Sequence, residues 1–174
     1  MSKFWIASLL PAMLCAQPLP SIADKEFRAN WEMSKRFTLA VADAMPVEKF
    51  GFKVNEEEMS FAVLMIHIAS TNAFRFAQIS GKPSPLNIPQ TIPKAEVKDI
   101  AKKLLAESFD YCIAQLDRFT PAQIDQLYKV DWFEREQVSG RQLVLGMFVH
   151  TAHHRAQAEV YLRANGIKPP DYRF

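Results

Sequence analysis

The sequence predicts an all-α protein: a four-helix bundle with a short extra helix before the last long helix. Four long stretches repeat apolar residues at steps of three and four, the spacing of one face of a helix. No stretch alternates apolar and polar residues over a length useful for a strand, and only five glycines occur in 174 residues. Four amphipathic helices joined by short and medium loops form a bundle, and this length suits one domain.

The predicted helices follow from their end signals. Pro46 ends the first helix, Ser60 caps the second, and Gly81 with Pro83 stops it. A proline-rich crossover leads to the third helix, and Thr120-Pro121 opens the short one. Ser139 caps the last helix, and Gly166 ends it. We therefore expect helices at residues 25–45, 60–79, 94–118, 120–128 and 139–165, with residues 129–138 ambiguous.

Composition excludes several classes of protein. Hydrophobic residues make up 49% of the chain, which argues against disorder. The net charge is +2, with acidic and basic residues interspersed and no basic run, so we expect no nucleic-acid partner. If Cys15 is removed with a leader, Cys112 has no partner and no internal disulfide can form.

Residues 1–23 are predicted to be a signal peptide, which leaves residues 24–174 as the mature domain. Lys3 gives a positive start, and residues 4–14 form an apolar run that is too short to span a bilayer. Cleavage after Ala16 or after Ala23 fits the small-residue rule, and the second site fits better. The alternative is an amphipathic first helix, against which three prolines argue: Pro11, Pro18 and Pro20. We expect a periplasmic or secreted protein without stable membrane insertion after cleavage.

The second predicted helix carries a histidine on its expected inner face. His67 lies at the centre of that face. An unpaired buried polar group costs about 1–3 kcal/mol, so His67 needs a hydrogen-bond partner or a metal ion. The residues expected to face inward are Ser60, Val63, Leu64, His67, Thr71, Phe74 and Gln78.

The last predicted helix carries the other three histidines. His150 and His154 are four residues apart, so both imidazoles point to one side, whereas His153 is about 100° from His154 and cannot join them. The pair shares its face with Leu143, Gly146, Met147, Gln157 and Tyr161, opposite Phe148, Ala152, Arg155, Glu159 and Arg163. Such a pair also arises by chance in a core. Thr151 follows the first histidine where a zinc protease needs Glu, which excludes a His-Glu-x-x-His protease.

Facing helices of a bundle can share a ligand, so His67 could meet His150 and His154. Three histidines with an open water position form a catalytically competent metal site. Imidazole ligands suit zinc, nickel, iron(II) or copper(II) and do not choose among them. Residues of a suitable type to orient the imidazoles are Gln157, Thr71, Tyr111 and Asp110.

The chain after residue 23 resembles the DinB-like proteins, also called YfiT-like metalloenzymes. The resemblance rests on residues 62–69 (AVLMIHIA), 147–157 (MFVHTAHHRAQ) and 161–170 (YLRANGIKPP). It implies a four-helix bundle that holds a divalent metal with three histidines, which here map onto His67, His150 and His154. Ala156 departs from the family pattern, because a glycine is common there. Some relatives transfer or isomerise groups with a low-molecular-weight thiol, and others look like hydrolases.

The expected function is a divalent-metal-binding protein that acts as a metal-dependent hydrolase or transferase. Export disfavours thiol transfer, so water activated by zinc, nickel or iron is the most economical reagent. The alternatives are a bundle that binds a metal or a small molecule without catalysis, and a structural bundle whose histidines satisfy one another. The sequence assigns no catalytic residue and no small-molecule substrate, and it leaves a homodimer open.

Overall fold

A computed structural model describes residues 25–131 and 136–172. Its long helices are α1 (Lys25–Ala44), α2 (Phe61–Ser80), α3 (Val97–Leu116) and α5 (Gly140–Ala164), with the short α4 (Pro121–Asp125) just before the last. The predicted four-helix bundle with an extra short helix is confirmed. The predicted signal peptide and Cys15 lie outside the described residues.

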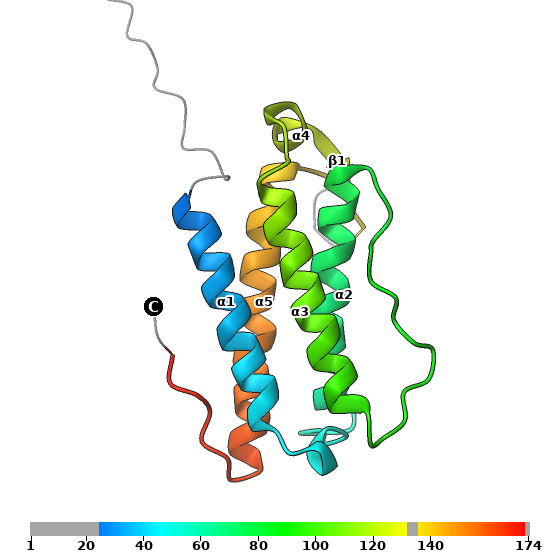
Figure 1. Ribbon diagram of the computed structural model, residues 1–174, viewed down its shortest axis with the longest axis vertical. Coiled ribbons are helices and arrows are strands. Elements are labelled where there is room, and N and C mark those ends of the chain that lie inside the picture. Colours follow the sequence, from blue (N-terminus) through cyan, green and yellow to red (C-terminus); the bar gives the residue numbers. More distant parts are fainter. Residues whose placement is uncertain (1–24, 132–135, 173–174) are drawn as a thin grey trace, which may run out of the picture.

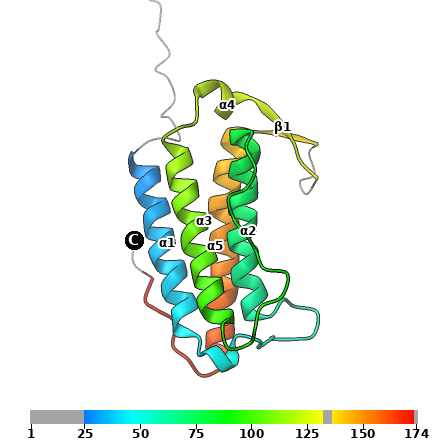
Figure 2. The same cartoon turned by 45° about the vertical axis from the view of Figure 1, so that its right-hand side comes forward.

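The four long helices form a closed square in which α2 and α5 are neighbours (Figures 1 and 2). Helix α1 packs against α3 and α5, and α2 packs against the same two helices. The long connection between α2 and α3 returns along the outside of the bundle, so these two helices run in the same direction, opposite to α1 and α5 (Figure 1). Because α2 and α5 are antiparallel neighbours, residues near the middle of each helix come face to face.

The predicted helix starts are confirmed by their caps. Ser60 Oγ accepts a hydrogen bond from Val63 N at 3.3 Å, and Thr120 and Ser139 each form a capping box with the glutamine three residues later. Gly81 ends α2 with a positive φ of 69°, a conformation that favours glycine. Helix α3 begins at Val97, three residues after the predicted start.

A two-stranded hairpin replaces the end of the predicted short helix. Helix α4 ends at Asp125 instead of near residue 128, and β1 (Leu127–Lys129) pairs antiparallel with β2 (Gln137–Ser139). Strands of three residues are too short to show alternation, which explains why the sequence did not predict them. Tyr128 ties the hairpin to the bundle, because its hydroxyl donates to the carbonyl oxygens of Ile79 and Gln123.

The core is centred on Trp31 of α1, which is fully buried. Its ring makes edge-on contacts with Phe76, Phe109 and Phe148, one from each of the other long helices, with centroids 5.4–5.7 Å apart. Such aromatic pairs add about 0.5–1.5 kcal/mol each to the free energy of burial. One large side chain therefore joins all four helices.

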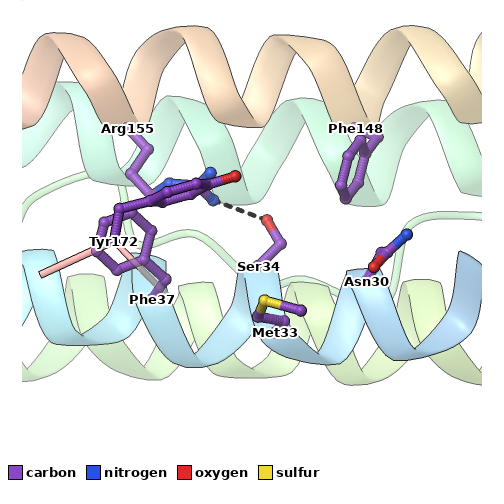
Figure 3. A pocket seen from close by; sticks show the side chains of 7 residues that line it. All are labelled: Asn30, Met33, Ser34, Phe37, Phe148, Arg155 and Tyr172. Atoms are coloured by element: carbon purple, nitrogen blue, oxygen red, sulfur yellow. Dashed lines mark hydrogen bonds between the residues drawn. The ribbon is translucent and has the colours of Figure 1, made fainter. Parts of the chain in front are cut away.

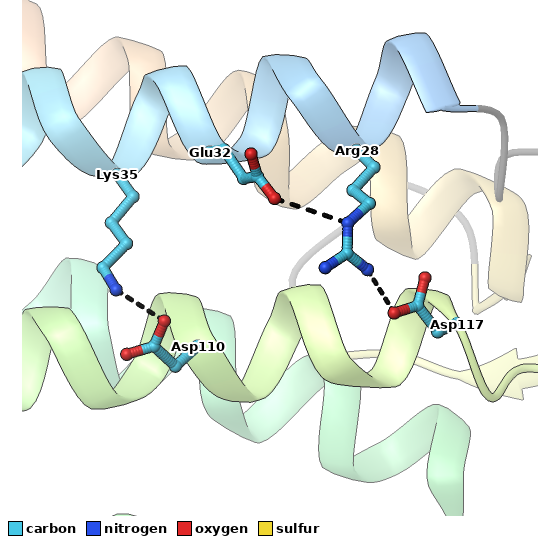
Figure 4. Close-up of polar contacts among 5 residues, drawn as sticks. All are labelled: Arg28, Glu32, Lys35, Asp110 and Asp117. Atoms are coloured by element: carbon cyan, nitrogen blue, oxygen red, sulfur yellow. Dashed lines mark hydrogen bonds and ion pairs between the residues drawn. The ribbon is translucent and has the colours of Figure 1, made fainter.

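Ion pairs on the surface reinforce the contact between α1 and α3. Arg28 bonds both Glu32 on its own helix and Asp117 at the end of α3, and Lys35 pairs with Asp110 at 2.5 Å (Figure 4). These carboxylates are exposed, so each pair adds at most about 1 kcal/mol to the stability.

In the described part of the chain, no helix has both the length and the apolar character needed to cross a bilayer.

The connection from α1 to α2 closes the end of the bundle where α5 finishes. It contains a short 3₁₀ helix (Val47–Lys49) and two aromatic residues, Phe50 and Phe52. Phe50 packs edge-on against Phe61 at 5.1 Å, and Phe52 packs against Tyr161 at 6.0 Å. The Tyr161 hydroxyl donates to Met59 O at 2.7 Å. These contacts hold the loop against α5.

Candidate metal centre

Three histidines from two helices converge between α2 and α5. The Nε2 atoms of His67 and His150 are 3.1 Å apart, and the ring centroids of the three pairs lie 4.4–5.0 Å from one another. One ring nitrogen from each of His67, His150 and His154 can be chosen so that all three lie within 4.8 Å of one another. The structure thus brings together the three residues that the sequence singled out.

His153 is on the same helix but outside this cluster. It is exposed, and its ring contacts that of His154, with centroids 4.9 Å apart. This agrees with the helical phase predicted for the four histidines. That His153 does not bind metal stays a prediction.

The environment of the cluster favours neutral imidazoles. All three rings are half-buried, and burial is the main reason why their pKa values fall below the ordinary value. For His150, burial and the neighbouring histidines lower the pKa to about 4. A metal ion binds only the deprotonated ring, so the site is ready for metal at neutral pH.

A relay of hydrogen bonds orients His154. Its Nδ1 lies 3.0 Å from Gln157 Oε1, and Gln157 Nε2 donates to Glu58 Oε2 at 2.8 Å. An ionised carboxylate can only accept, so the amide of Gln157 turns its NH₂ group to Glu58 and its oxygen to His154. Nδ1 of His154 must then carry the proton. Its Nε2 keeps a free lone pair for a metal ion.

Of the other three residues suggested to orient the imidazoles, only Thr71 lies beside a histidine. Thr71 Oγ1 lies 3.5 Å from His67 Nδ1, a long contact that leaves the ring less firmly held than that of His154. Tyr111 and Asp110 were wrong choices, because they lie on α3, which packs against α1 and α2 and away from α5. Tyr111 contacts Ser80, and Asp110 pairs with Lys35.

Asn72 and Thr151 fix how α2 and α5 meet beside the histidines. Both are fully buried, and they exchange two hydrogen bonds, of 2.9 and 3.2 Å. Neither this pair nor Glu58 was predicted from the sequence. A signal for Asn72 was present, because an amide between apolar residues such as Ala69 and Phe76 needs a buried partner. Nothing in the sequence marked Glu58 among the adjacent glutamates.

Two helix faces were predicted incorrectly. Val63 and Phe74 of α2 were placed inward, yet they are 51% and 55% exposed, and Arg155 of α5 was placed outward, yet it is buried. Helix α5 packs against two neighbours, so its buried face is wider than one stripe and includes Arg155. The buried face of α2 is instead rotated away from Val63 and Phe74, toward residues such as Met65 and Phe76. The histidine face of α5 meets α2, whereas Arg155 meets α1.

The donor set suits a divalent ion. Imidazole nitrogens bound to a tetrahedral zinc ion at about 2.0–2.1 Å lie about 3.3 Å apart. The 3.1 Å separation between His67 Nε2 and His150 Nε2 is close to this value. Nδ1 of His150 is buried without a partner among the described residues, which leaves its Nε2 as the nitrogen aimed into the cluster.

Comparisons with known proteins identify the family and support the fold. A family model described as the DinB superfamily matches residues 30–158. An uncharacterised Bacillus subtilis protein, YjoA, is 25% identical over 134 residues, covering 76% of this chain and 84% of YjoA. The crystal structure of DinB-like YjoA superposes with a TM-score of 0.65 at 23% identity, over 85% of this chain and 96% of that one. A DinB-like protein from Bacillus cereus gives 0.64 at 17% identity, over 84% and 95%.

Proposed function

Because the chain belongs to the DinB superfamily, we propose that it is a metal-dependent enzyme, a hydrolase or transferase whose ion is held by His67, His150 and His154. The observation that carries this proposal is the convergence of these three ring nitrogens between α2 and α5. Three neutral ligands leave room for a further ligand from solvent or substrate, which is the pattern of catalytic metal sites and not of structural ones. The ion would be zinc, nickel or iron(II).

The bound ion would act as a Lewis acid and lower the pKa of water to about 7. The chain supplies the remaining functions. Gln157 and Glu58 hold His154 in the tautomer that binds metal, and Asn72 with Thr151 keeps the two helices in register. These contacts keep the ligand positions fixed before any substrate enters.

A hollow beside the cluster supports entry of a small-molecule substrate. It has about 370 Å³ of empty space, part of it open to solvent, and Gln157 and Glu58 lie in its wall. The other lining residues are Val54, Asn55, Val160 and Tyr161. These lining residues include no histidine, but Gln157 bonds His154, so this hollow is one residue away from the proposed metal centre. Its wall combines apolar groups with amides and a carboxylate, as small-molecule sites commonly do.

The cellular location of the protein bears on whether it catalyses hydrolysis or group transfer. We propose that residues 1–23 direct export to the periplasm or the medium. Low-molecular-weight thiols are chiefly cytosolic, so export favours hydrolysis over thiol transfer.

Metal content is the first test. Protein purified without a histidine tag should carry about one divalent ion per chain. A panel of ester, amide and phosphoester substrates is then compared between metal-loaded and chelator-treated protein. Turnover that needs the ion supports the hydrolase. An ion without any turnover would favour a non-catalytic metal-binding bundle, and protein that stays metal-free after incubation with zinc, nickel and iron(II) rejects the proposal.

A further inference from the structure

Arg155 is a buried cation whose hydrogen-bond partners among the described residues are neutral. Its side chain faces α1, and only 7% of the residue is exposed. Nη1 donates to Ser34 Oγ at 2.8 Å and to Thr38 Oγ1 at 3.3 Å. Among the described residues, no carboxylate forms an ion pair with it. Charged side chains are rarely buried without an opposite charge, because their loss of hydration is large.

The charge of Arg155 is only weakly balanced by its surroundings. Burial lowers the pKa of the guanidinium, and this outweighs the opposing effects of Tyr172 and Glu159. Glu159 is one turn further along α5 and does not reach ion-pair distance. A guanidinium stays protonated even so, which leaves a positive charge in a largely apolar setting.

A hollow between α1, α5 and the C-terminal segment adjoins this charge. Its lining residues are Asn30, Met33, Ser34, Phe37, Phe148, Arg155 and Tyr172, and its empty space of about 270 Å³ is partly open to solvent (Figure 3). The guanidinium carbon lies 4.8 Å from the centre of the Phe37 ring, and the Tyr172 ring packs edge-on against Phe37 at 5.3 Å. The walls beside the cation are therefore aromatic.

Two donors of Arg155 remain for a ligand. Nε and Nη2 make no hydrogen bond within the described chain, and neither is among its enclosed unpaired polar atoms. These two N–H groups form one edge of the planar guanidinium, and that edge matches the two oxygens of a carboxylate. The hydroxyls of Ser34 and Thr38 hold the other edge and fix the plane.

We propose that this hollow binds a small organic monocarboxylate with an aromatic or short alkyl group, whose carboxylate pairs with Arg155. One cation balances one negative charge, whereas inorganic phosphate would bring a second charge into aromatic surroundings. The apolar part of the ligand would lie against Phe37, Phe148 and Tyr172. This site is separate from the histidines, because His154 and Arg155 point to different neighbours of α5, so the inference does not rest on the proposed function.

Nuclear magnetic resonance of the Arg155 Nε–H group tests the proposal directly. Benzoate is titrated into metal-free protein, because carboxylates also bind metal ions. We expect a saturable shift of this signal, with no shift from benzamide, which has the same shape without the charge, and none from inorganic phosphate. A signal that benzoate leaves unchanged at millimolar concentration overturns the proposal, as does equal binding of benzamide.

Variants locate the binding, which is measured here by saturation transfer from the protein to benzoate, because the Arg155 variants lack the Nε–H signal. Arg155→Met should abolish benzoate binding, and Arg155→Lys, which keeps the charge and loses the planar edge, should weaken it about tenfold. Arg163→Met, an exposed arginine of the same helix, and His150→Ala should leave it unchanged. If Arg155→Met does not fold, Tyr172→Ala serves instead, because Tyr172 is 59% exposed. This variant should lower the affinity for benzoate more than the affinity for acetate. Equal benzoate affinities in wild type and variant would contradict the proposal that Tyr172 contacts the apolar part of the ligand.

Discussion

Asn72 and Thr151 exchange two hydrogen bonds across the interface of α2 and α5, in a place that water does not reach. Thr151 follows His150 in the chain, and Asn72 lies just over one turn beyond His67. Sliding α2 along α5 by one residue would break both bonds and leave two polar groups unpaired. The pair therefore specifies the one register in which the histidines converge.

Thr151→Val should lower the free energy of unfolding by about 1–3 kcal/mol, because valine keeps the shape and leaves the Asn72 amide unsatisfied. Urea denaturation of the metal-free protein measures this loss. Adding Asn72→Leu should recover part of it, because the unpaired amide is then removed. Thr91→Val, in the exposed crossover, is the control. Equal stability of Thr151→Val and Thr91→Val would mean that the pair is dispensable.

The histidines differ in their expected effect on metal content. His67→Ala, His150→Ala and His154→Ala should each lose the ion or bind it at least tenfold more weakly, because two imidazoles cannot replace three. His153→Ala should retain it, since this ring lies outside the cluster. Elemental analysis after dialysis gives the metal content. Loss of the ion in the His153 variant to the same extent as in the others would contradict the assignment of ligands.

Gln157 is expected to act on the metal site through His154. Gln157→Leu removes the acceptor for His154 Nδ1–H, so we expect metal affinity to fall about 10–100-fold without loss of the ligand itself. Glu58→Ala should have a smaller effect in the same direction, because the amide then loses only its partner. Competition with a chromogenic chelator measures the affinities. Glu57→Ala, the exposed neighbour, is the matched control, and it should bind metal like the wild type.

The helices and the three histidines could be predicted because their signals are local or repeat along the chain. The cap at Ser60, the positive φ at Gly81 and the four-residue spacing of His150 and His154 depend only on nearby residues. His67 then meets His150 and His154 if their two helices are antiparallel neighbours, an arrangement that a four-helix bundle provides. The resemblance of the chain to the DinB-like family led to the same three residues.

The contacts that involve a third element could not be predicted in this way. Glu58 reaches Gln157 only because the loop before α2 is held against α5 by Phe52 and Tyr161. From the sequence alone, Arg155 was predicted to face solvent. It is buried because α1 packs beside it, where Ser34 accepts its hydrogen bond. Helical periodicity describes one face at a time, whereas each helix in this bundle buries two.

Export of the protein is tested by its mature N-terminus. Cleavage of the predicted signal peptide should leave a chain that begins near Asp24, or near Gln17 if the earlier site is used. N-terminal sequencing of protein from native cells, together with fractionation, measures both the start and the location. Recovery of an intact Met1 or Ser2 would refute export and bring thiol transfer back as a candidate reaction.

The histidine cluster should make the metal-free fold sensitive to acid. Burial is the main cause that lowers the pKa of His67, His150 and His154, and His150 falls to about 4. Positive charge on His153 and Arg75 adds to the effect at His150, whereas Gln157 and Glu58 oppose it at His154. In the unfolded chain these pKa values return to about 6.5. Between about pH 4 and pH 6.5 the unfolded state therefore binds more protons than the folded state.

Stability of the metal-free protein should therefore stay level above about pH 6.5 and fall as the pH drops toward about 4. Protonation of carboxylates also contributes at low pH, so the difference between wild type and His150→Gln isolates the histidine effect. This variant should show a shallower decline in urea denaturation, because glutamine carries no charge to desolvate. Bound metal should raise wild-type stability at neutral pH, and this gain should disappear as protons displace the ion from the histidines. Parallel curves for the two proteins would mean that His150 is not held neutral by its surroundings.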